Sequence, residues 1–244
     1  MDLGGLPVET DVSLGVWISS ARRGADPGTV ASLVPGVFEA YARVFHPAVR
    51  YAGDDDVDVS WAEVATHCGT VAHALMQWHT VTGSWDPQAD ESRSGVWDDA
   101  PAEGHLPVQV AERVATVLAR HTGTPDECLF GRWDGFGYDL PSPDDPPRLL
   151  LRGGHDVVLV RGTVADAVRN LAPEPHEQSA NLWWPADRAW CVVTDIDLRC
   201  TYVGGTADCI DDLLRTPGLE VLPVRPEDSS SLASDTVNPL PHRR

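Results

Sequence analysis

Apolar residues recur at helical spacing most clearly between residues 107 and 121. The side chains that share one face of this segment are Val110, Val114, Val117 and Leu118. A three- and four-residue spacing places apolar side chains on one side of an α-helix. Pro107 at the start and Gly123 just past the end are residues that helices favour at these two positions. We therefore expect an amphipathic helix over 107–121.

Further helices are predicted from their boundary residues. The segment Ser60–Glu63 has the sequence of a capping box, in which the serine accepts from the backbone of the glutamate and the glutamate reaches back. It predicts a helix over 61–67 that ends near Gly69. Two shorter helices are expected behind threonine caps, over 163–171 and 207–215.

Strands are predicted where aromatic and β-branched residues alternate with polar ones or form short apolar runs. The strongest is Trp190–Leu198, in which even-numbered side chains line one face and odd-numbered side chains the other. Segments 148–152 and 156–160 are expected to form a hairpin across Gly153 and Gly154. The remaining predicted strands are 38–47, 128–133 and 219–224.

Polar connections separate these elements. Residues 83–104 are rich in Gly, Ser, Asp and Pro, and a loop of this length is often functional. Residues 1–12 are expected to be a loose N-terminal segment, and residues 226–244 a disordered tail rich in Pro, Ser and Asp. Strands and helices mix without βαβ alternation. The pattern predicts a single α+β domain over 13–225, with a mixed, mainly antiparallel sheet and about three to five helices packed on it.

The composition adds a strong acidic excess to this picture. Of the 244 residues 42% are hydrophobic, which is enough for a sizeable core. The formal net charge is −19, from 18 basic and 37 acidic residues. Nucleic acids and anionic membranes are bound through cations, so neither is an expected partner. The charge favours solubility and would steer a basic protein partner toward the surface.

The basic residues exclude several enzyme classes. All 18 are arginine, and the chain contains no lysine. A Walker A loop, a pyridoxal phosphate site and a protein-kinase site each require a lysine. These sites are therefore excluded, and no cofactor is expected.

Cysteine usage and the absence of a targeting pattern indicate a cytoplasmic protein. The five cysteines include no C-x-x-C pair, and an odd count fits neither a disulfide framework nor a zinc ribbon. The N-terminus lacks the pattern of a signal peptide. The longest stretch without Asp, Glu or Arg, Val64–Trp85, contains three histidines and is a poor membrane span.

Tryptophan is unusually frequent, with nine copies against four each of Phe and Tyr. The tryptophans in predicted elements are expected in the core: Trp61, Trp78, Trp133 and Trp190. Trp183 and Trp184 lie instead in a predicted loop, where two adjacent rings cannot easily both be buried in one direction. An exposed Trp near Arg188 is typical of a binding hot spot, and with Tyr202 these residues are the candidate partner-binding group. The alternative is that both rings cover the core under the loop.

Asp195 and Asp197 are the candidate acid pair. On the predicted strand they share a face about 6.6 Å apart, a spacing suited to acid–base chemistry or to a divalent cation. His73 is the candidate third group, and it comes from a segment with other metal-ligand types, namely His67, Cys68 and His79. These histidines lie six residues apart and do not share one helix face. Solvated acids and ordinary polar side chains are therefore the alternative interpretation.

Four groups of segments resemble a family of uncharacterised actinobacterial proteins. The most specific runs from Asn181 to Gly205 and contains N-L-W-W-P-A-D-R-A-W-C, then D-I-D, then Y-V-G-G. The other matching segments are 33–47, 61–64 with 73–77, and 121–125 with 133–137. Together they span most of residues 33–225. The family has no established activity, so the resemblance implies no catalytic residues. A proline often follows the histidine of the second segment in that family, and here that position is Ala74.

The sequence favours an acidic protein-binding or regulatory module, of the immunity or antitoxin kind, with a basic protein as its partner. The alternative is a metal-assisted hydrolase or lyase that uses Asp195, Asp197 and histidines, among them His46. A third function, an acidic mimic of nucleic acid, would require carboxylates arrayed along one face.

Overall fold

The computed structural model describes residues 2–53, 55–87, 90–137, 146–151, 155–238 and 240. In this part the chain forms a ten-stranded sheet and a separate two-stranded sheet. The strands of the large sheet are β1 (Asp2–Leu3), β2 (Leu6–Glu9), β3 (Ala40–Phe45), β6 (Cys128–Trp133), β7 (Arg148–Leu149), β8 (Val157–Gly162), β9 (Leu182–Pro185), β10 (Cys191–Thr194), β11 (Cys200–Gly205) and β12 (Glu220–Val224). The strands of the small sheet are β4 (Ala48–Ala52) and β5 (Asp55–Val59).

Neighbouring strands of the large sheet run antiparallel throughout the described residues. Their order is β1-β2-β8-β6-β9-β10-β11-β3-β12, and β7 pairs with β8 beside this path. The predicted α+β class with a mainly antiparallel sheet is confirmed. The strand predicted over 38–47 is β3, and the strands predicted near 128–133 and 219–224 are β6 and β12.

The α-helices of the described residues are α1 (Val16–Ala21), α2 (Val30–Leu33), α3 (Trp61–Cys68), α4 (Trp78–Thr82), α5 (Val108–Leu118) and α6 (Ala207–Leu214). The capping box of α3 is present, and the helix ends on left-handed Gly69. Thr206 caps α6 by accepting from the backbone of Cys209. The short helix predicted over 163–171 is a 3₁₀ turn over Val164–Val168.

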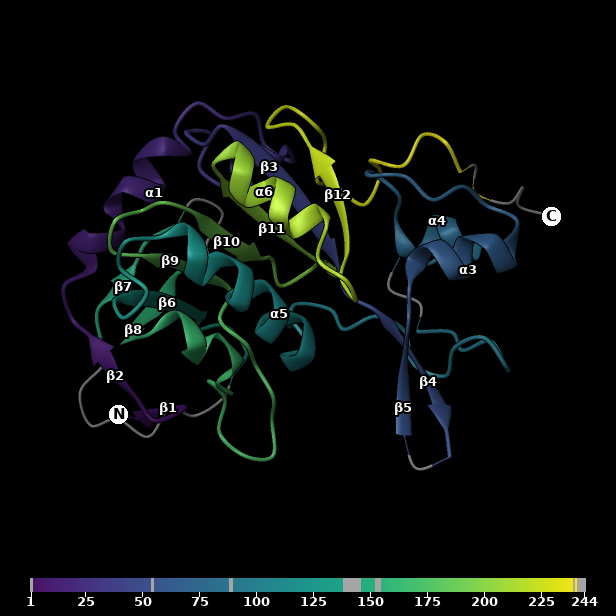
Figure 1. Cartoon of the computed structure of the whole chain (residues 1–244), viewed down its shortest axis with the longest axis horizontal. Coiled ribbons are helices and arrows are strands. Elements are labelled where there is room, and N and C mark those ends of the chain that lie inside the picture. Colours follow the sequence, from purple (N-terminus) through teal and green to yellow (C-terminus); the bar gives the residue numbers. More distant parts are fainter. Residues whose placement is uncertain are drawn as a thin grey trace.

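Both faces of the large sheet are covered, which gives the molecule two core layers. Helices α5 and α6 lie in front of the sheet in Figure 1 and bury apolar side chains such as Val114 and Leu213 against it. Helices α1 and α2 supply Ile18 and Val30 to the second layer. A strand between two covered faces buries consecutive side chains, because its residues alternate between the faces.

A third apolar cluster lies beyond the end of β3 and holds α3, α4 and the loop after them together. Its centre is an aromatic series of Phe45, Trp61, Trp78 and Trp97, with successive ring centres 5.0 to 5.4 Å apart. Figure 1 shows this part beside the large sheet, with the β4–β5 hairpin projecting from it. No helix or strand occurs among the described residues between 83 and 104.

The hairpin predicted over 148–160 is present in part. Strand β7 pairs with β8 in the expected antiparallel manner, while the turn at Gly153 and Gly154 lies outside the described residues.

Both chain ends differ from the sequence prediction. Residues 1–12, expected to be loose, contain β1 and β2, and β2 pairs with β8 while Leu3 and Leu6 are buried. Of the tail expected to be disordered, residues 226–238 are packed on the domain. The buried carboxylate of Asp235 accepts from Nε2 of His73 and from the amides of Val237 and Asn238, each at 2.9 Å. These hydrogen bonds hold the segment on the domain, although its polar composition predicted disorder.

Candidate functional site

The tryptophan pair predicted to bind a partner lies in the core. Trp183 and Trp184 belong to β9, near the centre of the large sheet, and each is 1% exposed. Trp183 packs into the layer under α5 and α6, and Trp184 packs into the layer under α1 and α2. Tyr202 is fully buried in β11. The prediction of an exposed aromatic hot spot is therefore wrong, because the sheet is covered on both faces.

Arg188 is the exposed member of the predicted binding group. It lies in the turn between β9 and β10 with a left-handed φ of 59°. Its guanidinium carbon lies 5.5 Å from the ring centre of Trp17, a distance typical of a cation–π contact. Arg188 therefore contacts a half-buried ring that packs against the second core layer, and it does not accompany an exposed Trp183 or Trp184.

Asp195 and Asp197 lie in the turn between β10 and β11, because β10 ends at Thr194. The amide of Asp197 donates to Oδ1 of Asp195 at 3.1 Å, a contact that stabilises a turn. Oδ2 of Asp195 lies 3.6 Å from Nδ1 of His155. The predicted arrangement of two carboxylates side by side on a strand is therefore wrong.

His73 is not brought to these carboxylates, since its Nε2 contacts Asp235 in the C-terminal segment. Across the residues that the structure describes, no three His, Cys, Asp or Glu side chains are grouped so that they could hold a metal ion. The residues proposed for a metal-assisted hydrolase are thus held in separate structural contacts.

His46 is fully buried and serves as a link between three segments. Its Nδ1 lies 2.7 Å from the carbonyl oxygen of Ala102, and its Nε2 lies 2.9 Å from Oγ1 of Thr201. A carbonyl only accepts, so Nδ1 carries the proton and Nε2 accepts from the threonine. Burial lowers the pKa of His46 to about 4, and the nearby charges of Arg43 and Arg199 act in the same direction.

We predict that His46 makes stability depend on pH. The unfolded imidazole has a pKa near 6.5 and the folded one about 4, so between these values the unfolded state binds the additional proton. The contribution of His46 to the free energy of unfolding is therefore fully present above pH 6.5. It decreases as the pH falls toward 4, with a total loss of about 3 kcal/mol. Urea unfolding of the wild type and of His46→Gln at pH 7 and pH 4 measures this. Equal losses in the two proteins would show that another group is responsible.

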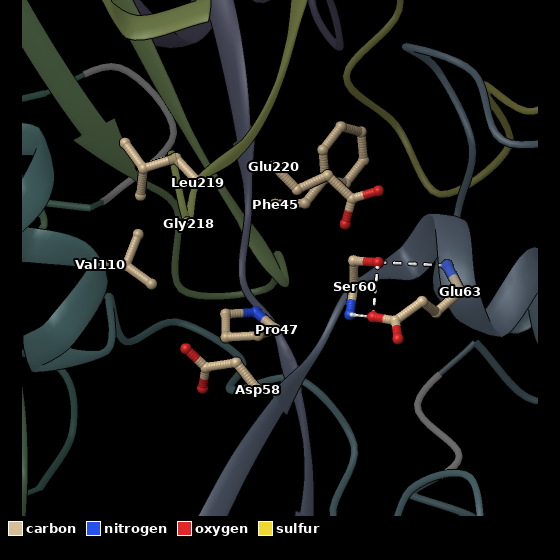
Figure 2. Close-up of a pocket in the computed structure, with 9 residues that line it drawn as sticks. All are labelled: Phe45, Pro47, Asp58, Ser60, Glu63, Val110, Gly218, Leu219 and Glu220. Carbon is tan, nitrogen blue, oxygen red and sulfur yellow. Dashed lines mark hydrogen bonds between the residues drawn. The ribbon is translucent and has the colours of Figure 1, made fainter. Parts of the chain in front are cut away.

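A cavity of about 200 Å³ opens between the large sheet and α3. Figure 2 shows Val110 and Leu219 on one side of it, Ser60 and Glu63 on the opposite side, and Asp58 close to Pro47. The cavity thus joins the helical layer of the sheet to the part that carries the β4–β5 hairpin.

Two of the carboxylates of this cavity have structural contacts. Glu220 accepts from the amides of Trp61 and Ala62 at 2.6 and 2.9 Å, so β12 caps the start of α3. Burial raises the pKa of Glu220, and these two hydrogen bonds oppose the rise. Glu63 accepts from the amide of Ser60 at 3.0 Å and completes the capping box. Asp58, by contrast, is exposed.

The cavity continues into an open groove of about 910 Å³ between the start of α5 and the hairpin. Pro47, Asp58 and Gly218 line both spaces. We call the larger space the acidic groove, after the carboxylates that line it: Asp56, Asp58, Asp99 and Glu177.

The positive groups of the acidic groove do not balance these acids. Nη1 of Arg113 donates to the carbonyl of Gly218 at 2.5 Å. His105 accepts at Nδ1 from the amide of Ser179 at 2.9 Å, and burial lowers its pKa below 6.5. His105 is therefore neutral near pH 7, and the groove has a negative charge.

In the described part of the chain, Tyr51 and Val108 offer exposed apolar surface at the border of the groove. Tyr51 is 55% exposed, and its register opposite Asp56 places both on the same face of the hairpin. The Tyr51 hydroxyl donates to Asp99 across that face. Val108, in the first turn of α5, is 48% exposed.

Sequence reasoning missed this site. The run Asp54–Asp56 is typical of a solvated turn, and nothing in the sequence links it to 99–109 or to Glu177. The available signal was Tyr51, an aromatic residue shortly before this acidic run.

None of the helices in the described ranges combines the length and the hydropathy needed to cross a membrane. Comparison with protein-family models, with curated proteins and with solved structures found no match for the chain.

Proposed function

We propose that the chain is a binding module whose acidic groove receives a cationic segment of a partner protein. The observation that carries this proposal is the imbalance of charge in the groove, where, among the described residues, four carboxylates face one arginine that is already bonded to a carbonyl. Arginine side chains of a partner would pair with these carboxylates through charge-assisted hydrogen bonds. The net charge of −19 would attract the same partner at long range.

Several features favour a polypeptide over a small cation. The groove is lined by the β4–β5 hairpin, by the loop that contains Asp99 and by the start of α5, so it spans several segments. Tyr51 and Val108 offer exposed apolar surface at its margins, and tyrosine is enriched among residues that dominate binding energy. Among the described strands β5 pairs with β4 alone, so an extended segment could also align along its other edge. The immunity- or antitoxin-like role predicted from the sequence is one form of such a module.

A short peptide of alternating arginine and serine is a suitable probe. We expect the wild type to bind it in low salt and to release it as the ionic strength rises. A variant that carries Asp56→Asn, Asp58→Asn and Glu177→Gln should bind at least about tenfold more weakly, because it lacks most of the free carboxylates of the groove. Fluorescence anisotropy of a labelled peptide measures both effects.

A control of equal net charge separates the groove from the general acidity of the surface. Asp26, Asp126 and Asp211 are exposed and lie outside the groove. Their triple replacement by Asn should leave peptide affinity close to that of the wild type. If both triple variants lose affinity equally, the groove has no special role and the proposal is wrong.

A further inference from the structure

A second, smaller pocket lies at one end of four adjacent strands, β8, β6, β9 and β10. Antiparallel neighbours bring the start of one strand beside the end of the next, so Val157, Trp133, Leu182 and Thr194 meet there. Residues at the end of α1 and on α2 close the pocket from the side. Its volume is about 50 Å³, which suits a molecule of a few heavy atoms.

Arg22 supplies a buried cation to this pocket. It follows α1 directly and is 6% exposed, yet its Nε and Nη2 atoms have no hydrogen-bond partner among the described residues. Burial lowers its pKa, but a guanidinium stays protonated in proteins. An uncompensated buried charge is strongly unfavourable, and an anion placed against it would remove that cost.

The neighbouring Cys191 does not provide the missing negative charge. Burial raises the pKa of this thiol to about 12, so near pH 7 it is neutral. The opposite charge that acts on Arg22 is that of Asp195, whose attraction opposes the effect of burial on the pKa of Arg22 without forming an ion pair among the described residues.

Asp195 supplies a carboxylate to the same pocket, at the turn after β10. Its side chain is 14% exposed, and the described residues include no ion pair between it and Arg22. His155 lies beside it, with its ring 5.8 Å from that of Trp133. An anion in the pocket would be attracted by Arg22 but repelled by Asp195. A cation would be attracted by Asp195 but repelled by Arg22.

We propose that this pocket binds a small zwitterion of the α-amino-acid class. Arg22 holds the carboxylate of the ligand through its free donors, and Asp195 accepts from the ammonium group. The pocket volume admits the backbone atoms of an amino acid, and any larger side chain would extend toward solvent past His155, which is 38% exposed.

Titration calorimetry with glycine tests this assignment on the full chain. Glycine should bind the wild type with a Kd on the order of 1 mM or tighter. Acetate and methylamine, which each carry one of the two charges, should bind at least about tenfold more weakly. Arg22→Gln and Asp195→Asn should each reduce glycine affinity by a similar factor.

Asp197→Asn is the matched control, since Asp197 lies in the same turn but is exposed and outside the pocket. It should bind glycine like the wild type. Melting curves provide a second readout, in which glycine raises the Tm of the wild type and of Asp197→Asn only. No heat and no Tm change with glycine, or equal binding by Arg22→Gln, would overturn the proposal.

Discussion

Trp183→Ala and Trp184→Ala should each lower the free energy of unfolding by about 3–5 kcal/mol, the range typical of a large buried aromatic residue. Both rings are 1% exposed, and each fills a different layer. Trp183 stacks on Phe130 with ring centres 5.9 Å apart, and Trp184 meets Trp17 edge to face at 6.4 Å. Urea unfolding followed by circular dichroism measures the loss.

Trp85→Ala is the matched control, because Trp85 is 44% exposed. Surface substitutions usually change stability by less than about 1 kcal/mol, and we expect this variant to stay within that range. If Trp184→Ala unfolded at the same urea concentration as the wild type, the central position of β9 would be wrong.

Arg43→Ala should destabilise the protein by a similar amount, about 3–5 kcal/mol. Arg43 is 1% exposed, and its Nη1 donates to the carbonyls of Ala74 and Met76 at 3.0 and 2.8 Å. Its guanidinium carbon lies 4.5 Å from the ring centre of Phe45. Alanine would leave both carbonyls buried without a donor and would open a cavity between β3 and the segment before α4.

Arg43→Lys separates the effect of charge from that of geometry. A lysine keeps the positive charge but lacks the planar donors of arginine, so we expect it to recover only part of the lost stability. Hydrogen exchange should locate the damage in the segment that Arg43 holds, near Ala74 and α4. A cost below about 1 kcal/mol for Arg43→Ala would contradict this account of the buried cation.

The sequence predicted the elements whose pattern reflects one buried face. Helix α5 buries Val110, Val114 and Leu118 as its spacing indicated, and the boundaries of α3 followed from its capping box. The pair Trp183–Trp184 was interpreted wrongly, because a loop was expected around Pro185. In a sheet covered on both faces a strand becomes a continuous apolar run, and alternation no longer marks it.

The turn between β10 and β11 was predicted wrongly because alternation is present there without a strand. Thr194 to Leu198 continues the polar–apolar alternation of the strand, although the chain turns at Ile196 and Asp197. The polar composition likewise predicted disorder after residue 225. In the structure Ser234 and Asn238 are buried, and both form hydrogen bonds with residues that are distant in the sequence. A local sequence pattern does not indicate hydrogen-bond partners that are so distant in the sequence.

One physical reason explains why neither candidate site could be predicted: each is assembled from segments that lie far apart in the sequence. The acidic groove combines the hairpin, the loop at Asp99 and the start of α5. The pocket of Arg22 combines the end of α1 with the ends of four strands. Among the catalytic and binding candidates predicted from the sequence, Asp195 alone lines one of these two spaces in the described part of the chain. It does so together with His155 and Arg22 rather than with Asp197.

Hydrogen exchange of the chain with and without the arginine–serine peptide tests the proposed binding function most directly. Helix α6 carries three carboxylates outside the groove: Asp208, then Asp211 paired with Arg215, then Asp212 paired with Arg120. We predict that bound peptide slows exchange in β4, β5 and residues 98–109, and leaves α6 unchanged. Equal protection of α6 and the hairpin would contradict the assignment of the acidic groove as the binding site.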